Sequence, residues 1–202
     1  MSVDLIYRAS TKEYALRQGE IVTGVVQYKP KLDNTTAPDS ISIPFQKIVH
    51  PYSIIVSQDC DLDWDYDARH NTHEAQNKEH KLLNSILLCE VDAARSIKND
   101  KNRGINRKEW NYIQTNRHER YHFFQKITPD FDLNEEGLPE LTLDFKRIFG
   151  IGAENLYFQI ENGIAKRRSV LNSPYLEHFS IRYHFFHQRV ALPAQIESIK
   201  EG

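Results

Sequence analysis

Five segments rich in β-branched and aromatic residues constrain the fold of this chain more than any other feature. They lie at residues 20–28, 52–58, 84–91, 120–127 and 141–150. Such composition favours strands, and Pro, Gly, Asn and Asp residues between the segments signal turns. Several short strands joined by turns are typical of small antiparallel barrels. The pattern therefore predicts an α+β protein built on a small, mainly antiparallel β-barrel.

An apolar stripe near the C-terminus predicts one long helix. Pro174 opens the segment at a position that proline favours, and Pro193 is expected to end it. The stripe residues follow one another at steps of three and four, so they share one face of a helix. They are Leu176, Phe179, Tyr183, Phe186 and Val190. We expect this face to pack against the barrel, with Phe179, Tyr183 and Phe186 largely buried.

Two shorter helices are predicted as insertions among the strands. Asn106 followed by Glu109 is the pattern of a capping box at a helix start. The segment 153–160 has apolar residues at helical spacing, and Gly163 follows it as a natural stop. The expected organisation is a single domain over 1–202, with an N-terminal arm at 1–18, the barrel with insertions at 19–163, and the C-terminal helix within 164–202.

Composition indicates the cellular compartment and the classes of partner to expect for this chain. The two cysteines, Cys60 and Cys89, show neither metal-site nor redox-motif spacing, which fits a reducing cytosol and predicts a cytoplasmic protein. No run approaches 18 apolar residues, and no secretory signal is visible, so we expect no membrane partner. The formal net charge is −2, which gives no overall basic character for binding nucleic acid.

The order of these segments resembles the MazF/PemK family of endoribonuclease toxins. The resemblance covers residues 19–163. It is carried by the phrase Gly19-Glu20-Ile21-Val22, by Val49-His50-Pro51, and by the run from Ile54 to Asp59. It implies a Src-homology-three-like barrel, and it places the chain among bacterial toxin–antitoxin or defence proteins.

Two positions depart from the family pattern. The family has arginine before the proline that opens the second strand, where this chain has His50. It has serine or threonine at the end of the next strand, where this chain has Glu90, Val91 and Asp92. An arginine suits the charge of a phosphorane, whereas histidine is an acid or base. If ribonuclease activity is retained, His50 with Glu90 or Asp92 would carry it.

An acidic segment follows the second strand of that order. Asp59, Asp61, Asp63, Asp65 and Asp67 alternate with Cys60, Leu62, Trp64 and Tyr66. If the segment continues as a strand, all five carboxylates share one face and the other residues face the core. Carboxylates suit Mg²⁺, Mn²⁺ or Ca²⁺, and Asp59, Asp61 and Asp63 are the metal candidates. A solvated edge strand is the alternative that we favour, and no metal or cofactor is expected.

Within that segment, Asp59 and Asp61 are the carboxylates that we expect to matter most for function. They follow a buried strand directly, and sites are commonly built at the ends of rigid elements. Their expected partners are His50, Arg69 or the basic C-terminal part. Cys60 beside His50 would be a nucleophile with a base, although small buried cysteines are commoner.

A short basic segment near the C-terminus offers a binding surface. Lys166, Arg167 and Arg168 are consecutive, and such residues bind phosphate groups. An ordinary solvated face, or an internal partner for the acidic segment, is the alternative.

Three functions follow from the sequence, and it does not decide whether the chain is an enzyme. The first is a non-catalytic binding or regulatory module, whose expected partner is another protein, with nucleic acid as the alternative. The second is a divergent MazF/PemK-like endoribonuclease. The third is a metal-dependent phosphoesterase that uses the carboxylates between Asp59 and Asp67.

Overall fold

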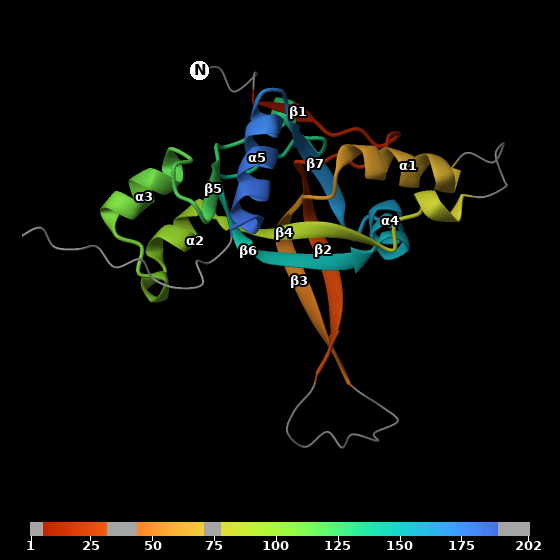
Figure 1. The fold of residues 1–202 in the computed structure, drawn as a ribbon, viewed down its shortest axis with the longest axis horizontal. Coiled ribbons are helices and arrows are strands. Elements are labelled where there is room, and N and C mark those ends of the chain that lie inside the picture. The colour runs from red at the N-terminus through yellow and green to blue at the C-terminus, as the bar shows by residue number, and fades with distance from the viewer. Residues whose placement is uncertain (1–5, 32–43, 71–77, 190–202) are drawn as a thin grey trace, which may run out of the picture.

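A computed structural model describes residues 6–31, 44–70 and 78–189. Its seven strands form one sheet in the order β1-β7-β2-β3-β4-β6-β5, in which every neighbouring pair is antiparallel (Figure 1). The strands are β1 (Tyr7–Ala9), β2 (Glu20–Pro30), β3 (Phe45–Ile55), β4 (Ser85–Ala93), β5 (Tyr121–Phe124), β6 (Leu141–Gly152) and β7 (Lys166–Leu171).

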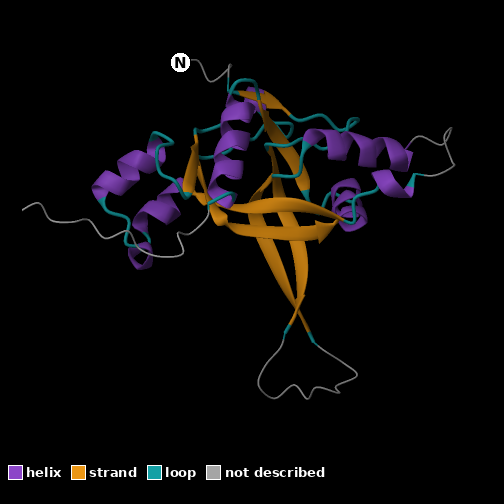
Figure 2. Ribbon diagram, viewed as in Figure 1, coloured by secondary structure: helices purple, strands orange, loops and turns teal. Residues whose placement is uncertain are grey.

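The helices are placed around this antiparallel sheet (Figure 2). They do not form the crossover connections of a parallel sheet. They are α1 (Asp59–His70), α2 (Ala94–Asn99), α3 (Arg107–Gln114), α4 (Ala153–Glu161) and α5 (Tyr175–His187). Three short 3₁₀ turns are η3 (Glu79–Lys81), η4 (Lys101–Arg103) and η5 (Pro129–Phe131). The predicted α+β class and the antiparallel sheet are confirmed.

Closure of the sheet into a barrel is not confirmed. The strand order begins at β1 and ends at β5, and these two strands do not pair with each other. They do approach each other, because the Tyr7 hydroxyl donates to the carbonyl oxygen of Gln125, just after β5, at 3.2 Å. The molecule is therefore an open antiparallel sheet whose two edges are linked by a side chain.

Several strand boundaries differ from those expected. The segment 1–18 was predicted as an arm, yet its residues 7–9 form β1 and pair with β7. The basic residues 166–171 were not predicted as a strand, yet they lie between β1 and β2. β3 begins at Phe45, seven residues before the predicted start at 52, and it passes through Pro51 without a break. Proline is tolerated there because β4 pairs only with residues 52–55 of β3.

Apolar clusters lie on both faces of the sheet. One cluster holds Phe179 and Phe186 of α5 against strands that include β4, β6 and β7. The other holds Leu62 of α1 and Leu156 of α4 against a different set of strand residues. Burial of Phe179 and Phe186 was predicted and is confirmed, while Tyr183 is half-buried.

The last helix is shorter than its pattern indicated. α5 ends at His187 rather than near Pro193, and Val190, the last residue of the predicted stripe, lies outside the described residues.

A third apolar cluster belongs to a helical insertion between β4 and β5. Trp110 and Ile113 of α3 pack with Ile97 of α2 and with the β5 residues Tyr121 and Phe123. The predicted capping box is confirmed, because Asn106 accepts from the Glu109 amide and Glu109 accepts from the Asn106 amide. The insertion therefore has a small core of its own and is attached firmly to the sheet.

Beyond the rest of the sheet, β2 and β3 continue as a two-stranded ribbon (Figure 1). β7 pairs with β2 only as far as Thr23. Just past that point, the side-chain amide of Gln159 in α4 takes the place of a strand. It accepts from the Val26 amide at 2.8 Å and donates to the Val26 carbonyl oxygen at 2.7 Å. One residue of α4 thus closes the edge of β2 where its pairing with β7 ends.

Candidate functional site

A bulge between β4 and β6 gathers charged side chains. Pairing is regular on both sides of Glu90, but four residues of β6, at 144–147, lie opposite this single residue. Extra residues bend a strand and redirect its side chains, and bulges are frequent beside functional sites. Here the bulge brings Arg147 into contact with Glu90. We call the ionisable residues around it the bulge cluster: His50, Glu90, Asp92, Arg103, Arg120, Asp144 and Arg147.

His50 and Glu90 form a hydrogen-bonded pair in this cluster. His50 Nδ1 lies 2.9 Å from Glu90 Oε1, and the two residues come from the adjacent strands β3 and β4. The imidazole ring stacks on Phe149 with 3.9 Å between ring centroids and 9° between planes. The side chain of His50 is 2% exposed, and its Nε2 is buried without a hydrogen-bond partner among the described residues.

The surroundings of His50 favour its neutral form. Burial lowers the pKa of His50, and the nearby positive charges of Lys29 and Arg147 lower it further, while Glu90 acts in the opposite direction. A neutral ring that donates from Nδ1 to Glu90 leaves Nε2 as a bare acceptor. That acceptor is enclosed by protein, so it does not reach a substrate in this conformation.

The remaining charges of the bulge cluster neutralise one another. Arg147 contacts both Glu90 and Asp92, the latter at 2.7 Å. Asp92 also binds Arg103 at 3.3 Å. The third carboxylate is that of Asp144, which is 2% exposed and accepts from Arg120 Nε at 2.8 Å. Three guanidinium groups thus face three carboxylates, and none is left to hold a phosphate.

The structure brings together part of the predicted catalytic set. His50 contacts Glu90 directly, and Asp92 joins the same cluster through Arg147. Arg147 itself was not predicted as a site residue. Its position depends on the bulge, and no pattern in the sequence marks where a bulge falls.

The acidic segment is a helix, so the expectation of a strand is wrong. Residues 59–70 form α1, in which alternating residues do not share a face. Leu62 and Asp65 are its buried residues, while Trp64 is 56% exposed and does not face the core. The five carboxylates are therefore distributed around the helix rather than along one face.

Three carboxylates of α1, those of Asp59, Asp63 and Asp65, have structural partners that differ from the ones expected for Asp59 and Asp61. Arg17 binds Asp59 and Asp63, one turn apart, each at 3.1 Å. Asp59 also accepts from the Gln18 amide at 2.7 Å. Of the expected partners, Arg69 lies in α1 and binds Asp65, not Asp59 or Asp61. Asp59 is therefore held by a structural ion pair, and the functional importance of Asp59 and Asp61 stays a prediction.

Asp65 is a buried anchor rather than a ligand. It accepts from Arg69 Nε at 3.0 Å and from the Leu83 amide at 2.7 Å, so it ties α1 to the segment that leads into β4. Among the described residues, no three His, Cys, Asp or Glu side chains are grouped so as to hold a metal ion. The set Asp59, Asp61 and Asp63 is therefore not a metal site in this arrangement.

Of the two cysteines, Cys60 differs from the expected burial and Cys89 agrees with it. Cys60 is exposed on α1, with sulfur contacts to Gln58 and Asp61, whereas His50 contacts Glu90 and Phe149. The proposed nucleophile–base pair is not formed. Cys89 is buried, as expected of a small apolar residue.

Two of the three basic residues at 166–168 are internal. Arg167 binds Glu20 with Nε to carboxylate oxygen at 2.6 Å, and Arg168 binds Asp132 at 2.6 Å. Both arginines are 6% exposed, and only Lys166 is open to solvent. The expected phosphate-binding surface is therefore wrong for Arg167 and Arg168, whose charges stabilise the fold.

A buried histidine of β5, His122, predicts a dependence of stability on pH. Burial, together with the positive charge of Arg182 and neighbouring His178, holds the pKa of His122 well below 6.5. The unfolded chain therefore binds a proton below pH 6.5 that the folded chain rejects, and folding stability falls as pH falls. Between pH 7.5 and 5.0 we expect a loss of about 2 kcal/mol from this group.

Urea unfolding at the two pH values measures this loss. His122→Phe should remove about 2 kcal/mol of the difference between the two pH values, whereas His80→Gln, at an exposed position, should leave it unchanged. An unaltered pH dependence in His122→Phe would contradict the assignment.

Comparison with known proteins does not add to this picture. No protein-family model, no curated protein and no solved structure matches the chain. In the described part of the chain, no helix has the length and apolar character needed to cross a membrane. The functional argument therefore rests on the geometry of the chain itself.

Proposed function

We propose that the chain is a non-catalytic binding module and that the bulge cluster stabilises its fold. The observation that carries this proposal is the enclosure of His50: its only unpaired nitrogen is buried beside Phe149. A general base must reach the proton that it removes. The neutralised arginines around it support the same proposal, since a free cation would be needed to stabilise a phosphorane.

The barrel resemblance remains part of the proposal. The contact between Tyr7 and Gln125 brings the edge strands β1 and β5 toward each other, as a small Src-homology-three-like barrel would require. We infer a fold related to the MazF/PemK barrels that is used for binding, because a fold can be retained where the chemistry is not.

A divergent endoribonuclease is the second candidate. One observation favours it: the His50–Glu90 pair lies beside Arg147, so an acid–base group and a guanidinium meet in one place. This activity requires a rearrangement that exposes His50 Nε2 and frees Arg147 from Asp92.

Nuclease assays test the proposal directly. Labelled RNA and DNA, incubated with the protein in Mg²⁺ and separately in EDTA, should show no cleavage above that given by Glu90→Gln. Glu90→Gln should instead lower the free energy of unfolding by about 1–3 kcal/mol, because it weakens hydrogen bonds to charged partners. Glu119→Gln, an exposed carboxylate, is the control for both measurements.

Two outcomes would overturn the proposal. Cleavage in EDTA that Glu90→Gln abolishes would establish the endoribonuclease. Cleavage that requires Mg²⁺ and survives Glu90→Gln would point to a metal-dependent phosphoesterase.

A further inference from the structure

The helical insertion between β4 and β5 is strongly basic, unlike the rest of the chain. Residues 94–117, which we call the basic lobe, carry seven Lys and Arg against two Asp and Glu, while the other residues carry 19 against 26. The net charge of −2 conceals this separation. A local excess of positive charge steers the approach of a polyanion even when the whole protein is acidic.

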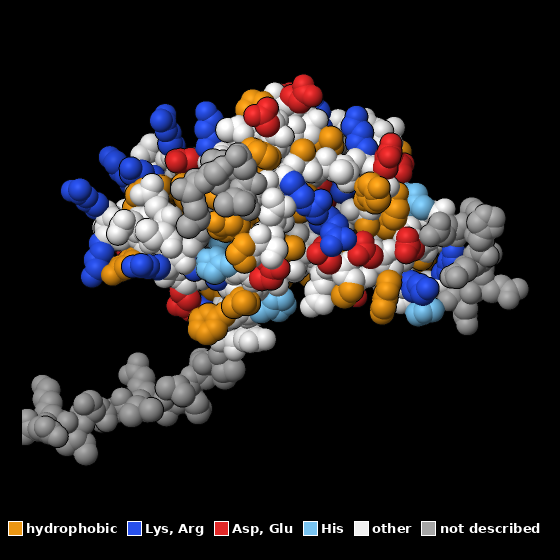
Figure 3. Space-filling model, turned by 90° about the horizontal axis from the view of Figure 1, so that it is seen from above, with side chains coloured by type: hydrophobic (Ala, Val, Ile, Leu, Met, Phe, Trp, Pro, Cys, Tyr) orange, Lys and Arg blue, Asp and Glu red, His pale blue; other side chains and the backbone are white. Residues whose placement is uncertain are grey.

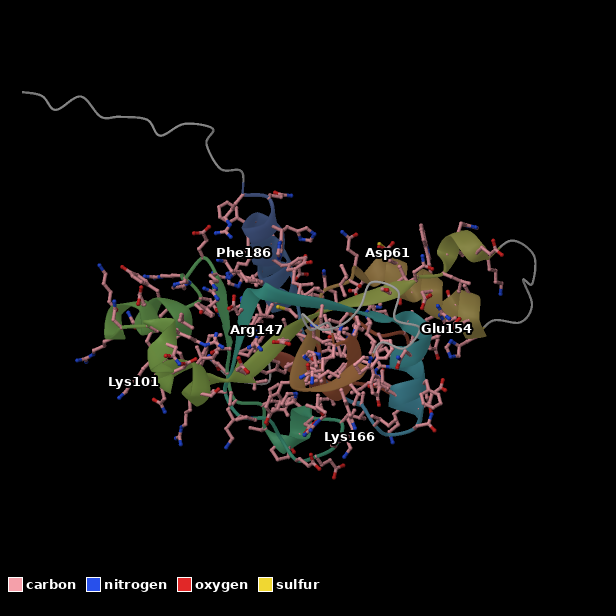
Figure 4. All side chains as sticks on the ribbon, turned by 90° about the horizontal axis from the view of Figure 1, so that it is seen from below. Asp61, Lys101, Arg147, Glu154, Lys166 and Phe186 are labelled. Atoms are coloured by element: carbon pink, nitrogen blue, oxygen red, sulfur yellow. The ribbon has the colours of Figure 1, made fainter. Side chains whose placement is uncertain are left out.

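Most of the positive charge of the lobe is unpaired and exposed. Arg103 alone turns inward, to Asp92 and Asp100, and Glu109 is engaged in the capping box. In the lobe, all of whose residues the structure describes, six cations have no ion-pair partner and are exposed to solvent. They are Arg95, Lys98, Lys101, Arg107, Lys108 and Arg117. Lys and Arg side chains gather at the left of Figure 3, the side on which α2 and α3 lie in Figure 1. Lys101 is labelled on the same side in Figure 4.

The exposed surface of α3 carries residue types that commonly contact base edges in DNA. Trp110 and Ile113 are buried in the small core, which leaves the rest of the helix surface to solvent. That surface presents Arg107, Lys108, Asn111 and Gln114, all exposed. Arg, Lys, Asn and Gln are the residues that pair with base edges in the major groove of B-form DNA.

A hollow beside α3 has the same character. It encloses about 950 Å³ and is lined by residues that include Lys98, Asn106, Arg107 and Asn111, and no carboxylate of the described residues lines it. Two cations lie near aromatic rings, with Lys98 Nζ 5.6 Å from the Trp110 ring centroid and Lys108 Nζ 6.0 Å from that of Tyr112. The cations are thus held at the surface without being neutralised.

We propose that the basic lobe binds double-stranded DNA, with α3 in the major groove. This inference rests on the proposed binding function and names its partner. The six exposed cations contact phosphates and supply affinity, while the polar face of α3 meets the base edges. A duplex of DNA is favoured over one of RNA because the major groove of A-form RNA is too narrow for side chains to read.

Fluorescence anisotropy with a labelled 24-base-pair DNA duplex, about two turns long, tests the proposal in the full chain. A triple variant, Arg107→Glu, Lys108→Glu and Arg117→Glu, should lower affinity at least about tenfold at 0.1 M salt. It should also reduce the slope of log affinity against log salt by about three, about one for each cation lost. Acidic residues suit the first turn of a helix, so α3 is expected to remain folded.

A second triple variant controls for total charge. Lys126→Glu, Lys146→Glu and Lys166→Glu alter three exposed lysines outside the lobe and change the net charge equally. The inference would be overturned by an equal loss of binding in the two triple variants, or by a wild-type protein that does not bind the duplex. Neither result would contradict the proposal that the chain is non-catalytic. Tighter binding of single-stranded DNA or of RNA than of the duplex would also overturn it. Duplex binding that is accompanied by cleavage would refute the non-catalytic proposal alone.

Discussion

Replacing Glu20 by alanine is expected to lower the free energy of unfolding by about 3–5 kcal/mol. Glu20 opens β2 and is fully buried. Its carboxylate accepts from Arg167 Nε at 2.6 Å and from the Ser10 hydroxyl at 2.6 Å, so it joins β2 to β7 and to the segment after β1. Alanine would leave the Arg167 guanidinium buried without a counter-charge, which costs far more than the loss of an exposed pair.

Urea unfolding monitored by circular dichroism measures this effect. The matched control is Glu119→Ala, which removes an exposed carboxylate 2.6 Å from Arg189 and should cost less than about 1 kcal/mol. The double replacement Glu20→Leu with Arg167→Met should recover most of the loss, because it removes both charges at once. A cost for Glu20→Ala as small as that of the control would show that Arg167 finds other compensation.

Replacing Phe179 by alanine is also expected to cost about 3–5 kcal/mol. The Phe179 ring is fully buried between α5 and the sheet, where it lies 6.0 Å from the ring of Phe124 and 6.2 Å from that of Phe145. Loss of the ring removes apolar contact area and leaves a cavity that the rigid sheet does not readily fill.

The same helix provides the control for this experiment. Phe185 is 65% exposed on the outer face of α5, so Phe185→Ala should change the free energy of unfolding by less than about 0.5 kcal/mol. Both variants are compared by denaturant melts at constant pH. Equal costs would show that Phe185 also packs against something in solution.

The sequence predicted the elements whose local pattern agrees with their final environment. The stripe of α5 places Phe179 and Phe186 on one face, and that face is buried. Prediction from the sequence was wrong where charged residues lie inside the protein. β7 looks like a surface segment because Arg167 and Arg168 are basic, and only the distant Glu20 and Asp132 make their burial acceptable. Such long-range compensation leaves no local signal.

α1 was predicted wrongly because two periodicities competed. The alternating aspartates gave a period of two, typical of a strand. The helical signal was also present, since Asp65 and Arg69 lie four residues apart and form an ion pair. The segment forms a helix because this places Leu62 and Asp65 together on one buried side.

The candidate site was predicted only in part. The resemblance drew attention to His50 and Glu90, and their strands do bring them together. Arg147 and the isolation of His50 Nε2 depend on the bulge and on stacking against Phe149. The basic lobe was visible as a local run of Lys, Arg and Asn, but the even charge balance of the whole chain concealed it.

The two hydrogen bonds between the Gln159 side chain and the Val26 backbone limit how copies of this chain can associate with one another. An unpaired strand edge is a template for the strands of other molecules, and concentrated solutions of such proteins tend to aggregate through it. A foreign strand that extends the sheet along β2 must break both hydrogen bonds that Gln159 makes with Val26. The side chain of a helix thus protects the base of the exposed ribbon against intermolecular β-sheet growth.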